Sequence, residues 1–425
     1  MIKKNIKINN IIFIFKILFY FSVFNNGLHA KDQNLKFEFS SLKNKKSWMS
    51  FNNKGIINQD NTFNLILSSK PNSKLYYKIS TSNGFSIKPK LRLGESFVRY
   101  KPSKNYHITL GKYYREFSQY LNDDLTSGSL IISNNAQAIP RIGIAGARNF
   151  NKIINSELNW GLSHGFLKKN KFYLDAPFIH EKFIYLNFGK STPVNYGIGI
   201  VHAAIWAGTT IDTIHNNNPG NQPDSFKDFL KVIIAADGPK LEGEPHANAL
   251  GSHNGIWDFY VTKKFKKRDV KLYYQHYFED TSSLRFANKT DGLWGIELIN
   301  KTKKNNYLFE FINTTNCCID PPYQNDIYYW NYQYNNGWKY IDMNIGNPFI
   351  NAEEIIEKSK IVNFGFLKDF NGDTFKLSVF RKINDYDIIK YNLKYSHKIE
   401  NISVSIILIG DENDLESGLS LSYTF

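Results

Sequence analysis

The 425 residues carry a formal net charge of +15, and 16% of them are aromatic, including 26 Tyr and 33 Phe. The only two cysteines are adjacent, which excludes a disulfide framework. After residue 30 no run reaches the roughly 18 consecutive apolar residues that a transmembrane helix needs, and a mean hydropathy of −0.40 suits a soluble protein or a β-barrel.

Residues 1–30 have the order of a secretory signal peptide. Three lysines lie within the first seven residues, residues 11–24 are nearly all apolar, and Ala30 supplies a small residue before Lys31. This order of charged, apolar and small residues is typical of a signal that is removed during export. Since residues 1–30 hold four lysines and no acid, the predicted mature chain, 31–425, has a net charge of +11, which hints at an acidic partner without identifying one.

Segments of alternating apolar and polar residues recur from about Asn61 to the C terminus. We count roughly 16 to 18 of them, each about 9 to 11 residues long, the length of a strand that crosses a bilayer at barrel tilt. The last segment, 418–425, alternates strictly and ends on Phe425, similar to the closing strand of bacterial outer-membrane barrels, which the barrel-insertion machinery reads. The pattern predicts an all-β fold, a transmembrane antiparallel outer-membrane β-barrel of about 18 strands, without a domain boundary.

Three irregular inserts interrupt the series, near 116–139, 207–252 and 314–358. They read as long extracellular loops on one mouth of the barrel, and the second and third are long enough to plug its lumen. Within the second insert, residues 224–236 place several apolar side chains on one face, which predicts an amphipathic helix.

The alternation also predicts which side chains face the lumen. Lysines are costly on a lipid face near the membrane midplane, by about 2–4 kcal/mol each. In the segment 389–399 the apolar residues alternate with three lysines, so the sequence predicts a basic stripe in the lumen that needs acids or an anionic guest. In the segment 256–263 the same phase sends Asp258 inward and Trp257 outward. The lysines of the predicted stripe are Lys390, Lys394 and Lys398.

Glu279, Asp280 and Asp291 suggest the carboxylate pair of a glycosidase. Adjacent strand residues point to opposite faces, however, so we predict structural roles in loop hydrogen bonding and no catalytic residue. The histidines, among them His180 and His202, lack the close two-His spacing of a metal site. We therefore predict no enzymatic activity, no metal site and no cofactor.

Five tryptophans, including Trp257, fall at or beside the inserts, where flat indole rings could stack on sugar rings while polar side chains hold the hydroxyls. The alternative is that they belong to an interfacial girdle, as the phase of Trp257 indicates. Cys317 and Cys318 form either a vicinal disulfide that stiffens a turn or two loop thiols. The candidate polysaccharide-binding residues are Trp206, Trp294, Trp330, Trp338, Asp291, Glu279, Asp280, His180 and His202.

Several dense motifs follow one another between about Gly94 and Phe349. They are Asn135–Pro140, His180-Glu181-Lys182, Val201–Gly208, Asn248–Gly251, Gln275–Asp280, Asp291–Gly295, Tyr329-Trp330-Asn331 with Gly337-Trp338, and Gly346-Asn347-Pro348-Phe349. The order and the residues of these motifs resemble those of the Wzi-type capsule assembly proteins, especially the branch common in Bacteroidota. The overall arrangement of the chain is similar as far as Phe425.

The resemblance implies an outer-membrane barrel of about eighteen strands whose outer mouth is closed by loops. It also implies a lectin-like role, holding newly exported capsular polysaccharide on the cell surface, without catalysis. The sequence departs from better-known members at its start, where Phe37-Glu38-Phe39 and residues 48–51 read as short strands in place of a periplasmic helical bundle.

Two functions share the barrel pattern. The first is a non-catalytic anchor for capsular or other surface polysaccharide, and the alternative is an anion-selective porin with a lysine-lined lumen. The size of the inserts favours the anchor, because a plugged lumen does not conduct. The other expected partners are outer-membrane lipid, lipopolysaccharide and the barrel-insertion machinery; no nucleic acid is expected.

Overall fold

The computed structural model describes residues 33–42, 54–55, 61–84, 91–151, 155–211, 220–240, 247–279, 286, 288–317, 327–355, 357–383 and 388–425. The predicted signal peptide, Asp280 and Cys318 lie outside these residues.

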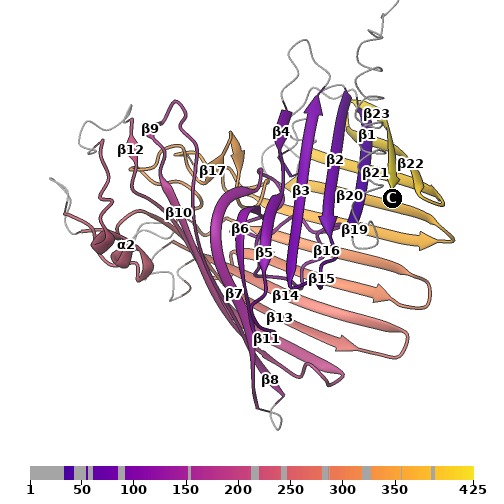
Figure 1. Cartoon of the computed structure of the whole chain (residues 1–425), viewed down its shortest axis with the longest axis horizontal. Helices are drawn as coiled ribbons and strands as arrows, with labels where there is room; N and C mark the ends of the chain where they lie inside the picture. The colour runs from indigo at the N-terminus through magenta and orange to yellow at the C-terminus, as the bar shows by residue number, and fades with distance from the viewer. Residues whose placement is uncertain are drawn as a thin grey trace, which may run out of the picture.

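One antiparallel sheet forms a closed barrel (Figure 1). Its first strand, β1 (Gln33–Leu42), pairs with β2 (Asn61–Ser69) on one side and with the last strand, β23 (Leu415–Thr424), on the other. The sheet has nineteen strand segments, but β4 (Leu91–Leu93) and β5 (Ser96–Tyr100) both pair with β3 (Leu75–Gly84) and share one position. The prediction of an antiparallel barrel of about 18 strands is therefore confirmed.

The remaining strands follow in chain order, and most have the length that crosses a bilayer. The other barrel strands are β6 (Tyr106–Tyr113), β7 (Ile139–Asn151), β8 (Ser156–Phe166), β10 (Phe178–Phe188), β11 (Val194–Trp206), β13 (Ser252–Lys264), β14 (Arg268–Phe278), β15 (Gly292–Asn300), β16 (Asn305–Asn313), β19 (Lys360–Phe370), β20 (Asp373–Ile383), β21 (Ile388–Ile399) and β22 (Ile402–Asp411). Outside the barrel sheet, β9 (Tyr173–Asp175) pairs with β12 (Thr209–Thr210), and β17 (Lys339–Tyr340) pairs with β18 (Met343–Asn344).

The connections divide between the two ends of the barrel. One end carries short hairpin turns, such as Asn371-Gly372, whose positive φ angles of 48° and 94° suit the tight turn between two twisted strands. The start of β1 lies at this end beside the end of β23, since Lys36 pairs with Thr424. The opposite end, which we call the mouth, is where the three long connections leave and re-enter the barrel, from β6 to β7, from β11 to β13 and from β16 to β19.

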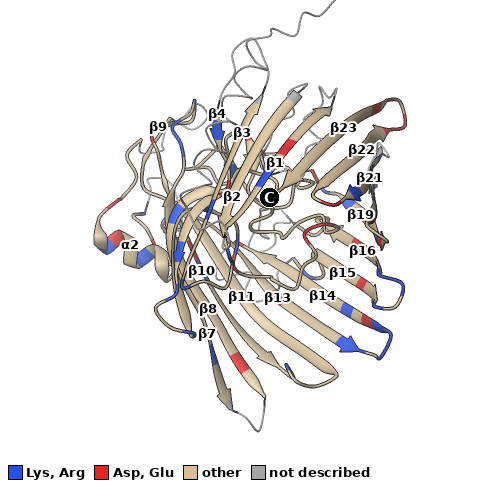
Figure 2. Cartoon of the chain, turned by 45° about the vertical axis from the view of Figure 1, so that its right-hand side comes forward, with Lys and Arg blue, Asp and Glu red and all other residues tan. Residues whose placement is uncertain are grey.

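The two faces of the wall differ in chemistry. Apolar side chains such as Ile184, Leu272 and Leu421 are exposed on the outer face, as contact with lipid requires. Polar side chains such as Asp258 and Gln275 point inward and are fully buried. Many of the charged residues lie near strand ends and turns (Figure 2). The alternation in the sequence thus predicted the orientation of Asp258 correctly.

The helix α2 (Phe226–Ile233) lies within the predicted span 224–236. Ser225 caps its N terminus, because the Ser225 hydroxyl accepts a hydrogen bond from the Asp228 amide and the Asp228 carboxylate accepts one from the Ser225 amide. Among the described residues, no helix has the length and apolar character needed to cross a membrane.

The closing contact between the chain ends is testable at Phe425. The Phe425 amide donates to the Leu35 carbonyl at 2.9 Å, and its ring packs on Phe37 at 5.7 Å between centroids. Replacing Phe425 with Ala removes aromatic contacts worth about 0.5–1.5 kcal/mol per pair. We predict less folded barrel in the membrane for F425A, measured by heat-modifiable mobility on gels. Leu419→Ala, exposed on the same strand, is the control; equal folded levels of both variants would contradict the prediction.

Candidate functional site

Residues 114–138 leave β6 at the mouth, cross the lumen and return to β7; we call them the plug. Leu125, Leu130 and Ile131 at its centre are at most 1% exposed. The segment has no helical or strand periodicity, so its backbone groups need partners from elsewhere. Inward-facing side chains of the wall supply these partners.

Asp258 on β13 holds the first part of the plug. Its carboxylate accepts hydrogen bonds from the hydroxyls of Ser118, Tyr120 and Tyr185, the first at 2.5 Å and the last at 2.6 Å. Burial and the nearby charge of Asp258 raise the pKa of Tyr120 well above its ordinary value, so the phenol stays protonated and donates. Gln275 on β14 extends this contact, since its side-chain oxygen accepts from the Leu130 amide at 3.0 Å.

Glu310 on β16 holds the middle of the plug. It accepts from the Thr126 hydroxyl at 2.6 Å, from the Ser127 amide at 2.7 Å and from the Asn363 side-chain amide at 2.7 Å. These donors satisfy the buried carboxylate. Without the plug, Glu310 would lose the Thr126 hydroxyl and the Ser127 amide. The wall and the plug therefore stabilise each other.

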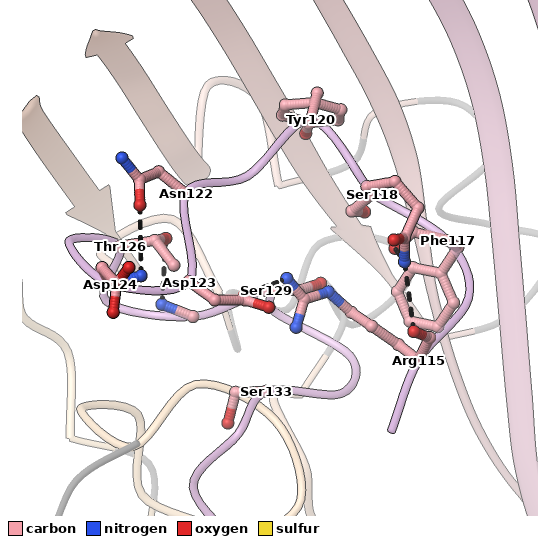
Figure 3. Close-up of polar contacts among 12 residues, drawn as sticks. Arg115, Phe117, Ser118, Tyr120, Asn122, Asp123, Asp124, Thr126, Ser129 and Ser133 are labelled. Carbon is pink, nitrogen blue, oxygen red and sulfur yellow. Dashed lines mark hydrogen bonds and ion pairs between the residues drawn. The ribbon is translucent and has the colours of Figure 1, made fainter. Parts of the chain in front are cut away.

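An ion pair fixes the point where the plug begins. Arg141 on β7 pairs with Glu181 on β10 at 2.6 Å, and both side chains are buried. The same guanidinium donates to the carbonyls of Tyr113 and Tyr114 at 3.0 and 2.6 Å. Inside the plug, the Arg115 guanidinium reaches Asp123 at 2.5 Å and thereby closes a compact loop (Figure 3).

The third insert packs onto the mouth side of the plug. The Trp338 indole donates to the Ile131 carbonyl at 2.7 Å, and the Asn347 side chain donates to the Gly128 carbonyl at 2.9 Å. Gly346 approaches the plug so closely that a Cβ atom there would lie 2.4 Å from the Leu130 carbonyl oxygen. This interface explains why the motif around Gly346 contains a glycine.

Residues 327–340, which we call the mouth segment, present aromatic and amide side chains at the barrel entrance. Its buried residues include Tyr328, Tyr329, Tyr334 and Trp338, which anchor it on the plug and wall. Its partly exposed residues include Trp330, Asn331, Tyr332, Gln333 and Asn335. Rigid aromatic faces beside amide groups are suited to stack on sugar rings and to hydrogen-bond their hydroxyls.

The mouth segment also contacts the second insert, because Asn248 donates to the Tyr332 hydroxyl at 3.4 Å. Trp330 and Trp338 of this segment were predicted from the sequence as binding residues, whereas Tyr332 and Gln333 were not. The signal that pointed to them is the density of Tyr, Asn and Gln between residues 327 and 336.

Three of the candidate residues lie together on the outer wall. His180, His202 and Trp206 belong to β10 and β11 and are buried beneath α2 and neighbouring residues, where Phe229 stacks on Trp206 at 5.5 Å between centroids. Trp294 also faces outward, 42% exposed and stacked on Tyr274 at 3.8 Å. These side chains therefore lie on the outer face of the wall and do not join the mouth segment described above.

The candidate carboxylates lie in the loops between strands. Asp291 is fully buried and accepts from the backbone and side-chain amides of Asn316, each at 2.8 Å. Glu279 follows the end of β14 and accepts from the Ile327 amide at 3.3 Å. Both take part in loop hydrogen bonding. Within the described part of the chain, no group of three His, Cys, Asp or Glu side chains is placed to hold a metal ion.

The three lysines of the basic stripe lie on one face of β21. Register pairs Lys390 with Phe380, which is buried against Phe349 of the third insert, so this face is the lumenal one. Lys394 lies directly opposite Lys376 of β20. Among the described carboxylates, the one paired with Lys376 is Asp124 of the plug, at 3.9 Å, and none pairs with Lys394.

These features define a class: a closed outer-membrane β-barrel whose lumen is occupied by its own inserts. Residues 24–362 match the model of the capsule assembly protein Wzi family, and the chain belongs to that family. No curated protein sequence matches the chain.

Solved structures share the fold. The barrel is similar to Wzi of Escherichia coli, described as an outer-membrane protein involved in group 1 capsule assembly and a carbohydrate-binding β-barrel, with a TM-score of 0.61, 12% identity, and coverage of 93% of this chain and 84% of that one. Two more distant matches are outer-membrane proteins. OccK3 of Pseudomonas aeruginosa has a TM-score of 0.44 and 11% identity, with coverage of 93% of this chain and 95% of that one. The channel DcaP of Acinetobacter baumannii has a TM-score of 0.37 and 9% identity, with coverage of 93% of this chain and 96% of that one.

The hydrogen bonds between wall and plug predict a closed pore that opens when Glu310 is lost. Glu310→Ala removes the carboxylate that accepts from the Ser127 amide, at a cost of about 1–3 kcal/mol for a buried group left unpaired. The Asn363 side chain loses one of its two acceptors and keeps the Leu125 carbonyl. In planar bilayers we expect little conductance from the parent protein and frequent openings from E310A. Glu38→Gln, a lumenal change on β1 away from the plug, should resemble the parent. Large steady currents from the parent protein would contradict this prediction.

Proposed function

We propose that this protein binds capsular or related surface polysaccharide at its closed mouth and anchors it to the cell, in the manner of a lectin and without catalysis. The observation that carries the proposal is the mouth segment, whose aromatic and amide side chains stand on a buried plug and so form a rigid surface rather than a passage. Membership of the capsule assembly family and the fold shared with a carbohydrate-binding barrel support it.

In this proposal Trp330 and Tyr332 stack on sugar rings, and Asn331 and Gln333 hold hydroxyl groups. The long inserts face the cell exterior, because outer-membrane barrels have short turns on the periplasmic side and longer loops outside. In this barrel the start of β1 and the end of β23 lie at the end with the short turns. The buried candidates, among them Trp338 and Asp291, support the binding surface from below. A rigid surface of this kind loses little entropy on binding, which favours retention of a flexible polymer.

The lysines of β20 and β21 suggest that the glycan is acidic. Lys376 and Lys394 are direct cross-strand neighbours, and like charges in this arrangement destabilise a sheet. An acidic sugar that enters the lumen beside the plug would relieve this repulsion. The same lysines would favour anions in a porin, but hydrogen bonds from five strands to the plug oppose an open path.

Trp330→Ala combined with Tyr332→Ala tests the mouth surface. We expect binding of purified surface polysaccharide to weaken about tenfold or more, equivalent to about 1.4 kcal/mol, because the stacking faces are lost. Isothermal titration measures the affinity. Trp294→Ala removes an exposed indole from the outer wall and should leave it unchanged. Unaltered affinity of the double variant, with the barrel folded, would overturn the assignment of the mouth segment.

Replacing Lys390, Lys394 and Lys398 with Gln tests the acidic-glycan assignment. We expect weaker retention of surface polysaccharide, with a larger loss at low salt, where the lysine charges are least screened. Cell-surface polysaccharide is quantified after washing at two ionic strengths. The control exchanges three turn lysines for Gln (Lys266, Lys267 and Lys303), with the same change in net charge. If both triple variants retain polysaccharide alike, the lumenal stripe has a structural role only.

A further inference from the structure

The helix α2 lies against the outside of the barrel, beside β10 in Figure 1. On β10, Phe183 packs on Phe117 of the plug and the Tyr185 hydroxyl contacts Ser118, so these residues face inward. Residues that alternate with them, including His180 and Lys182, therefore face outward. The ring of Phe229 in α2 lies 5.5 Å from the ring of His180, which places the helix on the outer wall.

One side of α2 is fixed to this wall. Val232 is fully buried, and Phe229 contacts the rings of His164 and Trp206. The Lys182 ammonium group donates to the Ile233 carbonyl and so holds the C-terminal end of the helix. The capping box at Ser225 stabilises the other end. The helix is thus a docked element of defined orientation.

A second side of α2 is apolar and has no covering residues in the described chain. Phe226, Leu230 and Ile234 recur every four residues and are 75%, 49% and 73% exposed. A soluble surface helix normally turns such a row toward the protein. In α2, the row that packs on the wall is the neighbouring one, which contains Phe229 and Val232. The helix therefore has two apolar rows, and the outer row points away from the barrel.

The outer row continues the lipid-facing surface of the barrel. Lys182, which holds the helix end, is followed on the same face of β10 by Ile184 and Leu186, both exposed. One step along a strand face is about 6.6–6.8 Å, so the lipid belt begins directly below α2. Leu162 and Ile198 extend this belt to the strands on either side.

Lysines border the outer row. Lys227 and Lys231 follow Phe226 and Leu230 by one residue each, which places them about 100° further around the helix. An apolar row with lysines along its edge is the arrangement of a helix that lies in a membrane interface, with its apolar side among acyl chains and its cations at the headgroups.

We infer that α2 is a lipid-binding site at the outer rim of the barrel. Its occupant is an acylated, phosphate-bearing lipid of the outer leaflet, with chemistry such as that of lipopolysaccharide. The acyl chains pack on Phe226, Leu230 and Ile234, and the phosphate groups lie at Lys227 and Lys231. The site is separate from the mouth segment, and so it does not depend on polysaccharide binding.

Photocrosslinking in intact cells tests this inference. The photoreactive residue benzoylphenylalanine replaces Leu230 as the test position, Ile184 in the lipid belt as the positive control, and Tyr332 at the mouth as the negative control. After irradiation, lipid adducts are detected by radiolabelled phosphate and acetate and by antibody to lipopolysaccharide. We expect lipid adducts at 230 and 184 and none at 332. A protein adduct at 230, or no lipid adduct there while 184 reacts, would overturn the inference.

A second variant separates the charge from the apolar row. Lys227→Gln with Lys231→Gln should lower the yield of the phosphate-bearing adduct at 230 severalfold while the folded barrel level stays constant. Lys266→Gln with Lys267→Gln, in a turn at the opposite end, is the matched control and should leave the yield unchanged. An unchanged yield in the α2 variant would overturn the assignment of the lysines to phosphate.

Discussion

Carboxylates buried in the lumen must be supplied with hydrogen-bond donors, and the rest of the structure depends on this constraint. Asp258 and Glu310 are fully buried and would be costly in an empty apolar interior. The plug provides hydroxyl donors to Asp258, and a hydroxyl and a backbone amide to Glu310. Because each partner needs the other, wall and plug form one unit rather than a barrel with an optional lid.

Around this unit the protein presents three separate regions, which are the mouth segment, the lumenal lysines and the outer wall with α2. The plug closes the lumen and supports the mouth segment, where Trp330 and Tyr332 remain accessible. The lumenal lysines lie on β20 and β21, and Lys376 among them reaches Asp124 of the plug. On the outer wall, α2 extends the apolar belt at the rim. The proposed role of holding a polymer at the surface requires a rigid platform and a stable position in the membrane, and this arrangement is suited to both.

The strands and their faces were predictable because the pleat repeats every two residues and lipid tolerates few charges. This logic oriented Asp258 and Trp257 correctly. The path of the plug was not predictable, since contacts such as Ser118 with Asp258 join residues 140 positions apart and follow no local pattern. The helix was predicted within 224–236, but its apolar residues serve two surfaces, a split that helical periodicity alone does not reveal. The same helix covers His180 and His202, which the sequence could not place.

Hydrogen exchange of the purified protein, with and without purified surface polysaccharide, tests the central claim most directly. Slower exchange in the mouth segment and around residues 247–251, with unchanged protection of the plug at 114–138, is the result that the account predicts. Unchanged exchange at the mouth, or faster exchange throughout the plug, would contradict it, because the glycan would then bind elsewhere or pass through an opened lumen.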